Sequence, residues 1–229
     1  MVDRPARDKL ARGLRSYLEE KVTAFDLDEV VQESEASQDE AVRVTAGALW
    51  YHYDDVKDHH VVADKPEWDY FHRLLLLLES DGELEVRRTR TWTPRQFIAI
   101  AFVVGFAAAV LFFGFEQVGV GAALVCGVAS IILSRWHVHS AYRQDCEGST
   151  LIPFGTFGEI RRARRSVAWF KKRPYPSALA GRQIRSPIVA AVLMLPWLLL
   201  WALFGPLVLL VQSLPEATTS FSVRVPTAQ

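Results

Sequence analysis

The stretch from Phe97 to Leu133 constrains the fold of this chain more than any other. Residues 97–115 are nineteen positions without a charge, and residues 118–133 form a second apolar run. At about 1.5 Å of rise per residue, the first run makes roughly 28 Å of helix, close to the ~30 Å hydrocarbon thickness of a bilayer. Backbone polar groups in lipid must be paired within their own segment, so both runs are expected to be helical. The sequence therefore predicts a transmembrane helical hairpin.

Small residues recur at every fourth position in both runs. In an antiparallel hairpin that turns at Glu116 and Gln117, the two stripes are expected to face one another and let the backbones approach closely. Self-association through the same stripe and coincidence stay open as alternatives. The residues predicted to pack the helices are Ala101, Gly105 and Ala109 in the first run, and Gly119, Ala123 and Gly127 in the second.

A third apolar run, residues 188–211, is long enough to span a bilayer with some tilt. Pro196 is expected to kink it, and the Gly205-Pro206 step marks a second weak point. A kinked third span is the favoured interpretation, and a re-entrant or surface-lying segment is the alternative. The polar residues that follow predict a disordered tail.

The formal net charge is zero, but the charges are strongly segregated along the chain. Residues 1–86 carry 10 Lys and Arg against 21 Asp and Glu, whereas residues 135–186 carry 11 against 3. Arginines also precede the first apolar run, and the connection between the first two runs has no Lys or Arg. Because basic flanks stay in the cytoplasm, we expect the N-terminus and the middle loop there and the C-terminus outside.

The acidic N-terminal region is expected to form a small, mostly helical domain. Asp3 is placed to cap a first helix, Ser37 to open a capping box before another, and Asp64 with Pro66 to begin a third. Residues 83–92 alternate in charge and look extended, so the domain is expected to hold at most a two-stranded ribbon. The strong negative charge argues against binding to nucleic acid.

The middle loop contains a predicted amphipathic helix, residues 157–172, which begins at a capping box formed by Thr156 and Glu159. Its apolar positions share one face, and basic residues occupy the rest, which is typical of a helix lying in a membrane interface. The open alternatives are an incidental pattern and docking of this basic loop on the acidic domain. The residues predicted to bind anionic phospholipids are Arg161, Arg162, Arg164, Arg165, Trp169, Lys171 and Lys172.

Candidate catalytic chemistry is sparse in this sequence. His52, His59 and His60 are weak metal candidates, because the residue one helical turn after His52 is Val56, which cannot bind a metal, and no HExxH is present. His137 and His139 lack a partner histidine on another span for haem. There is no P-loop, GxSxG or GxGxxG motif. The sequence therefore favours a protein that is not an enzyme, with no catalytic residue, metal or cofactor.

These patterns predict an all-α membrane protein with a transmembrane hairpin, a third kinked span and a cytoplasmic N-terminal domain, multi-pass in the inner membrane of a bacterial cell. The expected function is a non-enzymatic scaffold or accessory subunit that binds an unidentified protein partner and anionic lipid. The alternatives are an oligomeric transporter or channel subunit and a membrane-bound, metal-dependent enzyme. A homo-oligomer is possible. The expected divisions are residues 1–92 (domain), 93–134 (hairpin), 135–186 (basic loop), 187–212 (third span) and 213–229 (tail).

Overall fold

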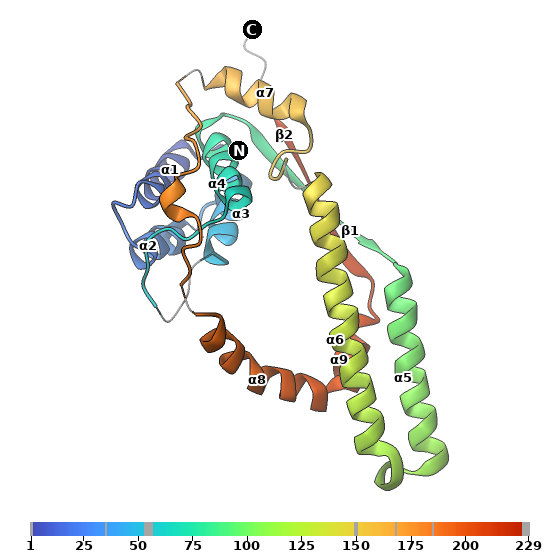
Figure 1. Cartoon of the computed structure of the whole chain (residues 1–229). Helices are drawn as coiled ribbons and strands as arrows, with labels where there is room; N and C mark the ends of the chain where they lie inside the picture. Colours follow the sequence, from blue (N-terminus) through green and yellow to red (C-terminus); the bar gives the residue numbers. More distant parts are fainter. Residues whose placement is uncertain are drawn as a thin grey trace. The chain divides into compact units, whose positions relative to one another are not determined.

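The computed structural model describes residues 2–34, 36–52, 57–148, 151–167, 169–184 and 186–225. The chain divides into two compact units, each assembled from separated segments (Figure 1). We call the first the helical unit; it comprises Met1–Arg87, Gly148–Ile184 and Ser220–Gln229. We call the second the hairpin unit; it comprises Arg88–Glu147 and Arg185–Thr219.

Four helices make up most of the helical unit. They begin where side chains accept hydrogen bonds from the first backbone N–H groups, which otherwise have no partner in a helix. The predicted caps at Asp3 and Asp64 are confirmed, but Asp39 rather than Ser37 caps the third helix. The four helices are α1 (Arg4–Leu18), α2 (Ala24–Ser34), α3 (Glu40–Trp50) and α4 (Lys65–Glu79).

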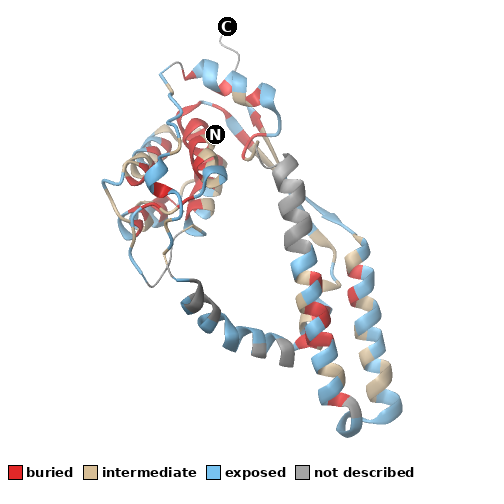
Figure 2. Ribbon diagram, viewed as in Figure 1, coloured by how far each residue is buried: buried red, intermediate tan, exposed pale blue. Residues whose placement is uncertain are grey.

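The apolar faces of these helices meet in one core, which appears as the buried interior in Figure 2. Trp68 and Phe71 of α4 are each 1% exposed at its centre. Leucines at helical spacing on α1 and α4 surround them, as the 3.6-residue repeat of the sequence requires. The leucines buried there include Leu10, Leu14, Leu18, Leu27, Leu49, Leu74, Leu75 and Leu78.

A buried ion pair fixes the N-terminus of α1 against α3 and the end of α4. Arg7 is fully buried, and its Nε donates to Asp39 Oδ2 at 2.6 Å, while its Nη2 donates to Asp39 Oδ1 at 2.9 Å. Its Nη1 donates to the carbonyl oxygen of Ser80 at 2.7 Å, which satisfies a backbone acceptor at the C-terminal end of α4.

A two-stranded ribbon follows the helices. It pairs β1 (Glu83–Thr91) with β2 (Glu216–Arg224). Arg224 lies beside Glu85, whereas Thr218 lies beside Thr91, so the strands run antiparallel. The extended stretch predicted at residues 83–92 is confirmed as β1, but the strand that pairs with it was not predicted.

The partner strand β2 corrects the prediction of a disordered tail from residue 213 onward. Phe221, Val223 and Val225 alternate in the sequence and pack into a second apolar cluster with Leu77 and Phe154. Burial of this alternating face outweighs the polar composition of the tail. The chain is therefore mostly helical with a small sheet, and the predicted all-α class is not confirmed.

The hairpin unit contains α5 (Pro94–Phe113) and α6 (Phe115–Gly148). The turn lies at Gly114 rather than at Glu116 and Gln117, because Gly114 has a φ of 81°, a conformation that favours glycine. Residues 94–113 and 119–136 are each long and apolar enough to cross a membrane. Only 11% of the first stretch is buried within the protein, so its apolar surface faces outward (Figure 2).

The third apolar run forms two helices instead of one continuous span. They are α8 (Pro187–Leu203), which contains Pro196, and α9 (Gly205–Gln212). The chain breaks at Phe204, immediately before the Gly205-Pro206 step, and not at Pro196. Proline is tolerated in the first turn of a helix, so Pro206 begins α9.

α9 packs against the hairpin. Leu209 is fully buried among Ala99 of α5 and Cys126, Ala129 and Leu133 of α6. The Gln212 amide donates to Ser134 Oγ at 2.7 Å, so α9 ends beside α6.

The third span, predicted over residues 188–211, is not confirmed, and the composition of the helical unit argues against it. Residues 148–184 and 220–225 belong to the same folded unit as residues 2–87. A folded unit lies on one side of a bilayer, so the chain between its segments must return to the side that it left. A single crossing over residues 188–211 would place the end of the chain on the opposite side. The structure therefore gives no support for a C-terminus across the membrane from the N-terminus, and the side on which it lies stays a prediction.

Candidate functional site: the basic segment on the helical bundle

The predicted lipid-binding residues lie on or after α7 (Phe157–Ser166). Thr156 caps this helix as predicted, since its Oγ1 accepts a hydrogen bond from the backbone N–H of Glu159 at 3.3 Å. The buried Glu159 carboxylate accepts hydrogen bonds from the backbone N–H groups of Gly155 and Val223, each at 2.9 Å. These contacts tie the start of α7 to strand β2.

The apolar face of α7 is covered by protein. Ala163 is fully buried and Val167 is 3% exposed, and Ala163 packs in the cluster that contains Leu77 and Val223. This face is therefore not available to acyl chains, which corrects the expectation of a helix inserted into the membrane interface. Amphipathicity indicates that one face is buried, but it does not identify what covers it.

The basic face of α7 points outward. Arg161, Arg162, Arg164 and Arg165 are all exposed, and within the described part of the chain none of them forms an ion pair. The helix ends at Ser166, so Trp169, Lys171 and Lys172 lie on an extended segment and not on the predicted helix through residue 172.

Residues 169–184, which we call the strap, cross the bundle. Ion pairs and a buried apolar side chain fix them to it. Lys172 pairs with Asp69 at 2.7 Å and Arg173 pairs with Glu19 at 2.5 Å. Leu179 is buried in the main core. Docking of the basic loop on the acidic domain, one of the alternatives raised by the sequence, is confirmed.

Hydrogen bonds from side chains to backbone carbonyl oxygens also join the strap to the bundle. The Trp68 indole N–H donates to the carbonyl oxygen of Arg173 at 3.2 Å, and the Tyr175 hydroxyl donates to that of Ala63 at 3.1 Å. Such contacts persist in salt, whereas surface ion pairs weaken.

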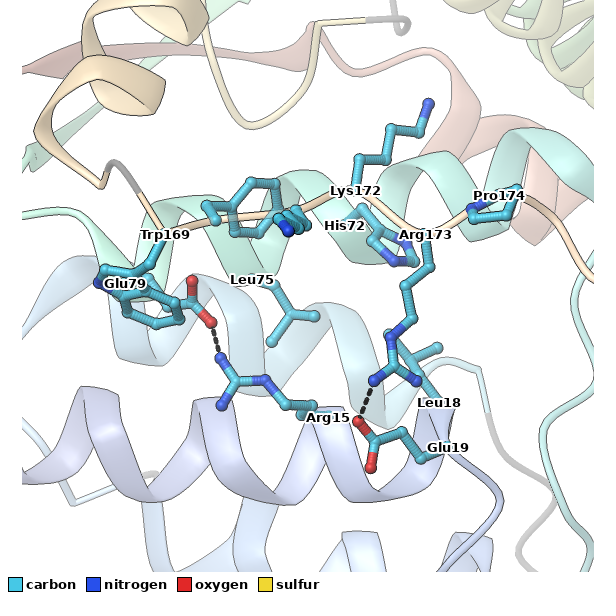
Figure 3. Close-up of a pocket in the computed structure, with 12 residues that line it drawn as sticks. Arg15, Leu18, Glu19, His72, Leu75, Glu79, Trp169, Lys172, Arg173 and Pro174 are labelled. Carbon is cyan, nitrogen blue, oxygen red and sulfur yellow. Dashed lines mark hydrogen bonds and ion pairs between the residues drawn. The ribbon is translucent and has the colours of Figure 1, made fainter.

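A pocket of about 540 Å³ lies where the strap crosses α1 and α4 (Figure 3). Leu18 and Leu75 form the apolar wall of the pocket. The exposed Trp169 indole stands at one end, with the Arg15 guanidinium 5.5 Å from its ring centre. The polar residues that line it are Arg15, Glu19, His72, Glu79, Lys171, Lys172 and Arg173.

Two buried polar residues of α4 face this pocket. The Glu79 side chain is 4% exposed; one carboxylate oxygen pairs with Arg15, and the other, Oε2, is buried without a hydrogen-bond partner. Burial raises the pKa of Glu79 above its ordinary value, although Arg15 opposes this change. Burial lowers the pKa of His72, whose Nδ1 lies 2.8 Å from the carbonyl oxygen of Trp68. The neutral His72 ring therefore donates through Nδ1 and leaves Nε2 as an acceptor.

His72 and Glu79 were not predicted as site residues, although the sequence contains a signal for them. His72 and Glu79 interrupt the apolar face of α4 at the same spacing as its buried leucines. Polar residues at core positions require partners, so they mark places where a helix faces something other than apolar side chains.

The small-residue stripes of the hairpin do not interlock as predicted. A Cβ on Gly105 would meet no atom within 4 Å, so no neighbouring backbone approaches it. Gly127 instead meets Gly205 of α9, where an added Cβ would collide with the Gly127 backbone. The atoms nearest to a Cβ on Gly119 would be those of the Phe115 ring, on its own helix.

Ala101, Gly105 and Ala109 line a groove of about 430 Å³ with residues of α6. The residues that α6 contributes are Ala122, Val125 and Cys126. The stripe residue Ala123 is not among them.

The weak metal candidates are not brought together. His52 packs edge-on against Phe71, with its Nδ1 3.8 Å from a Glu67 oxygen, and burial lowers its pKa. His59 Nδ1 lies 2.7 Å from the carbonyl oxygen of His60. In the residues that the structure describes, no three histidine, cysteine or carboxylate groups are placed to hold a metal ion. The side chains of His137 and His139 lie outside the described residues.

Two aromatic residues form an exposed pair at the end of α3. The ring centres of Trp50 and Tyr51 are 5.1 Å apart in an edge-to-face arrangement, and Tyr51 is 81% exposed. Trp68 of α4 is buried in the core and is not part of this exposed surface.

Comparisons of this chain with protein-family models, with curated proteins and with solved structures find no match.

Proposed function

We propose that this protein is a membrane-anchored, non-enzymatic scaffold or accessory subunit whose helical unit lies at the cytoplasmic face of the inner membrane. The hairpin α5–α6 is its anchor, because its apolar stretches, residues 94–113 and 119–136, match the hydrocarbon thickness and expose apolar surface. Arg87, Arg88 and Arg90 precede α5, Arg95 lies in its first turn, and all four favour a cytoplasmic N-terminal side.

In this proposal the C-terminus is also cytoplasmic, since β2 belongs partly to the helical unit. Segments α8 and α9 then enter the apolar phase and leave on the same side. Exposed apolar side chains along α8, among them Leu193, Leu195 and Trp197, support its contact with lipid.

The basic face of α7 is proposed to bind anionic phospholipid headgroups. The observation that carries this step is that four arginines project from a helix whose opposite face is already buried in protein. They are exposed and have no carboxylate partner among the described residues, so they attract anions at a surface, and each contributes about 1 kcal/mol near an anionic membrane. The exposed Trp50–Tyr51 pair is the proposed contact for a protein partner, since aromatic residues are enriched at the centres of interfaces.

Binding to vesicles tests the lipid step. The full chain is reconstituted in nanodiscs of phosphatidylcholine, and its association with vesicles that contain phosphatidylglycerol is measured at low and high salt. Changing Arg161, Arg162, Arg164 and Arg165 to Gln removes up to about 4 kcal/mol of attraction before screening. We therefore expect vesicle binding to fall roughly tenfold or more.

A matched control removes four other exposed cations of the helical unit. This variant changes Arg12, Lys21, Arg43 and Lys65 to Gln and has the same net charge as the test variant. If both variants lose binding equally, net charge alone drives the association, and the α7 surface is not the binding site.

A further inference from the structure

The pocket beneath the strap contains an acceptor that the protein leaves unsatisfied. Glu79 Oε2 is buried in the pocket wall without a hydrogen-bond partner, although its sister oxygen pairs with Arg15. An unpaired buried acceptor costs about 1–3 kcal/mol, so a native structure rarely leaves one unless something else binds it. A ligand that carries a donor group would remove this cost.

A second acceptor lies on the same face of α4. His72 and Glu79 both line the pocket, with Leu75 between them. Seven residues of helix separate them by about 10 Å along the axis. Since Nδ1 of His72 is directed at the Trp68 carbonyl, Nε2 is the ring atom left to accept a hydrogen bond. The two acceptors favour a ligand with more than one hydroxyl or amine donor.

Cations outnumber carboxylates in the polar lining of the pocket. Arg15, Lys171, Lys172 and Arg173 line the pocket against only two carboxylates, Glu19 and Glu79. Lys172 and Arg173 are engaged with Asp69 and Glu19, whereas Lys171 is exposed and has no ion pair in the described part of the chain. This excess of positive charge favours an anion at the pocket mouth.

We propose that this pocket binds a phosphate ester that carries hydroxyl groups, of the kind found in the glycerol phosphate headgroup of an anionic phospholipid. The phosphate lies against Lys171 and the neighbouring guanidinium groups. A hydroxyl donates to Glu79 Oε2, and the apolar part of the molecule covers Leu18, Leu75 and the Trp169 ring. This inference rests on the proposed binding of anionic lipid and gives it one specific site, separate from the arginines of α7.

The test uses the full chain, purified in an uncharged detergent and freed of lipid. Native mass spectrometry measures one-to-one binding of four probes. Dihexanoyl phosphatidylglycerol carries phosphate and hydroxyls, dihexanoyl phosphatidylethanol keeps the phosphate but lacks the hydroxyls, glycerol 3-phosphate lacks the acyl chains, and inorganic phosphate lacks all but the anion. We expect phosphatidylglycerol to bind at least about tenfold more tightly than phosphatidylethanol, because hydrogen bonds to a charged group are worth about 1.5–3 kcal/mol.

Two variants locate the binding. Lys171→Gln should weaken phosphatidylglycerol about tenfold, whereas Lys65→Gln, an exposed lysine away from the pocket, should leave it unchanged. Glu79→Gln should remove the preference for phosphatidylglycerol over phosphatidylethanol. Should this buried change prevent folding, the preference of the wild-type chain and the effect of Lys171→Gln still decide the question.

The outcomes are separable from those of the vesicle experiment. Tight binding of glycerol 3-phosphate, equal to that of the lipid, assigns the pocket to a soluble ester; binding of the lipid alone assigns it to the membrane. The proposal is overturned if Lys171→Gln binds like wild type, if phosphatidylethanol binds equally well, or if inorganic phosphate binds as tightly as either ester. If the α7 variant loses vesicle binding but keeps one-to-one binding of phosphatidylglycerol, the pocket is a site separate from the α7 arginines.

Discussion

The ion pair between Arg7 and Asp39 allows a sharp test of how the helical unit is held together. Their side chains are 1% and 3% exposed, so water screens them little. Changing Asp39 to Ala leaves the Arg7 guanidinium buried without a counter-charge, which costs about 3–5 kcal/mol. The same change removes the N-cap of α3, where Asp39 accepts a hydrogen bond from the Ala41 N–H. Loss of this cap lowers the free energy of unfolding by about 1 kcal/mol more.

The expected loss, about 4–6 kcal/mol, is a large part of the 5–15 kcal/mol that stabilises a typical domain. Urea unfolding of the full chain in detergent, followed by circular dichroism, measures it. Glu40→Ala is the control, because Glu40 makes a partly exposed pair with Arg43 and should change stability by less than about 1 kcal/mol. Replacing both partners, as Arg7→Met with Asp39→Leu, should recover much of the loss, since buried pairs are often replaceable by apolar residues.

The pH dependence has a definite sign. Burial acts to raise the pKa of Asp39, but hydrogen bonds from Arg7 and the Asp3 backbone outweigh it, and the pKa lies below its ordinary value. The contribution of Asp39 is therefore complete above the ordinary value of 3.8 and is lost as the pH falls through the lower value of the folded state. The reasoning is refuted if Asp39→Ala and Glu40→Ala unfold within about 1 kcal/mol of each other at pH 7.

Three further predictions follow from other parts of the structure. Gly205→Val should lower the unfolding temperature of the detergent-solubilised chain, because its Cβ collides with the Gly127 backbone, whereas Gly121→Val, with no atom within 4 Å, should not; equal shifts would contradict the packing of α9. Tags at the two ends of the chain should be labelled from the same side of sealed membranes, and labelling from opposite sides would restore the third span. Stability should fall as the pH drops below 6.5, the ordinary pKa of histidine, because burial lowers the pKa of His72 and only the unfolded state takes up the proton. His72→Gln should flatten this part of the profile, and an unchanged slope would assign it to other groups.

Local signals in the sequence predicted the elements that depend on local physics. The caps at Asp3, Asp64 and Thr156, with helical spacing behind them, identified α1, α4 and α7. The length of the uncharged run from Phe97 identified α5 as a candidate membrane helix. Helix capping and the length of an apolar run depend only on residues near one another in the sequence, so these elements can be predicted from the sequence alone.

What the sequence left undetermined depends on partners far away in the chain. The alternation of Phe221 and Val223 is short, and only pairing with β1 makes it a strand. The amphipathic pattern of α7 suits a membrane or a protein equally well, and here Phe154 and Val223 lie in the cluster that covers it. Gly127 suits any close helix contact, and the helix that uses it is α9 rather than α5.

The composite nature of the helical unit has a consequence for synthesis of the protein. Residues 148–184 and strand β2 both follow the hairpin in the chain, so the unit cannot close until both have been translated. Leu77 and neighbouring apolar side chains of the N-terminal helices therefore stay uncovered until those later segments pack on them. In the proposed topology, a hairpin inserted in the wrong orientation would leave residues 148–184 and 220–225 on the other side of the membrane from residues 2–87. In the proposed topology, only a chain that has all these segments on one side of the membrane can bury that apolar surface.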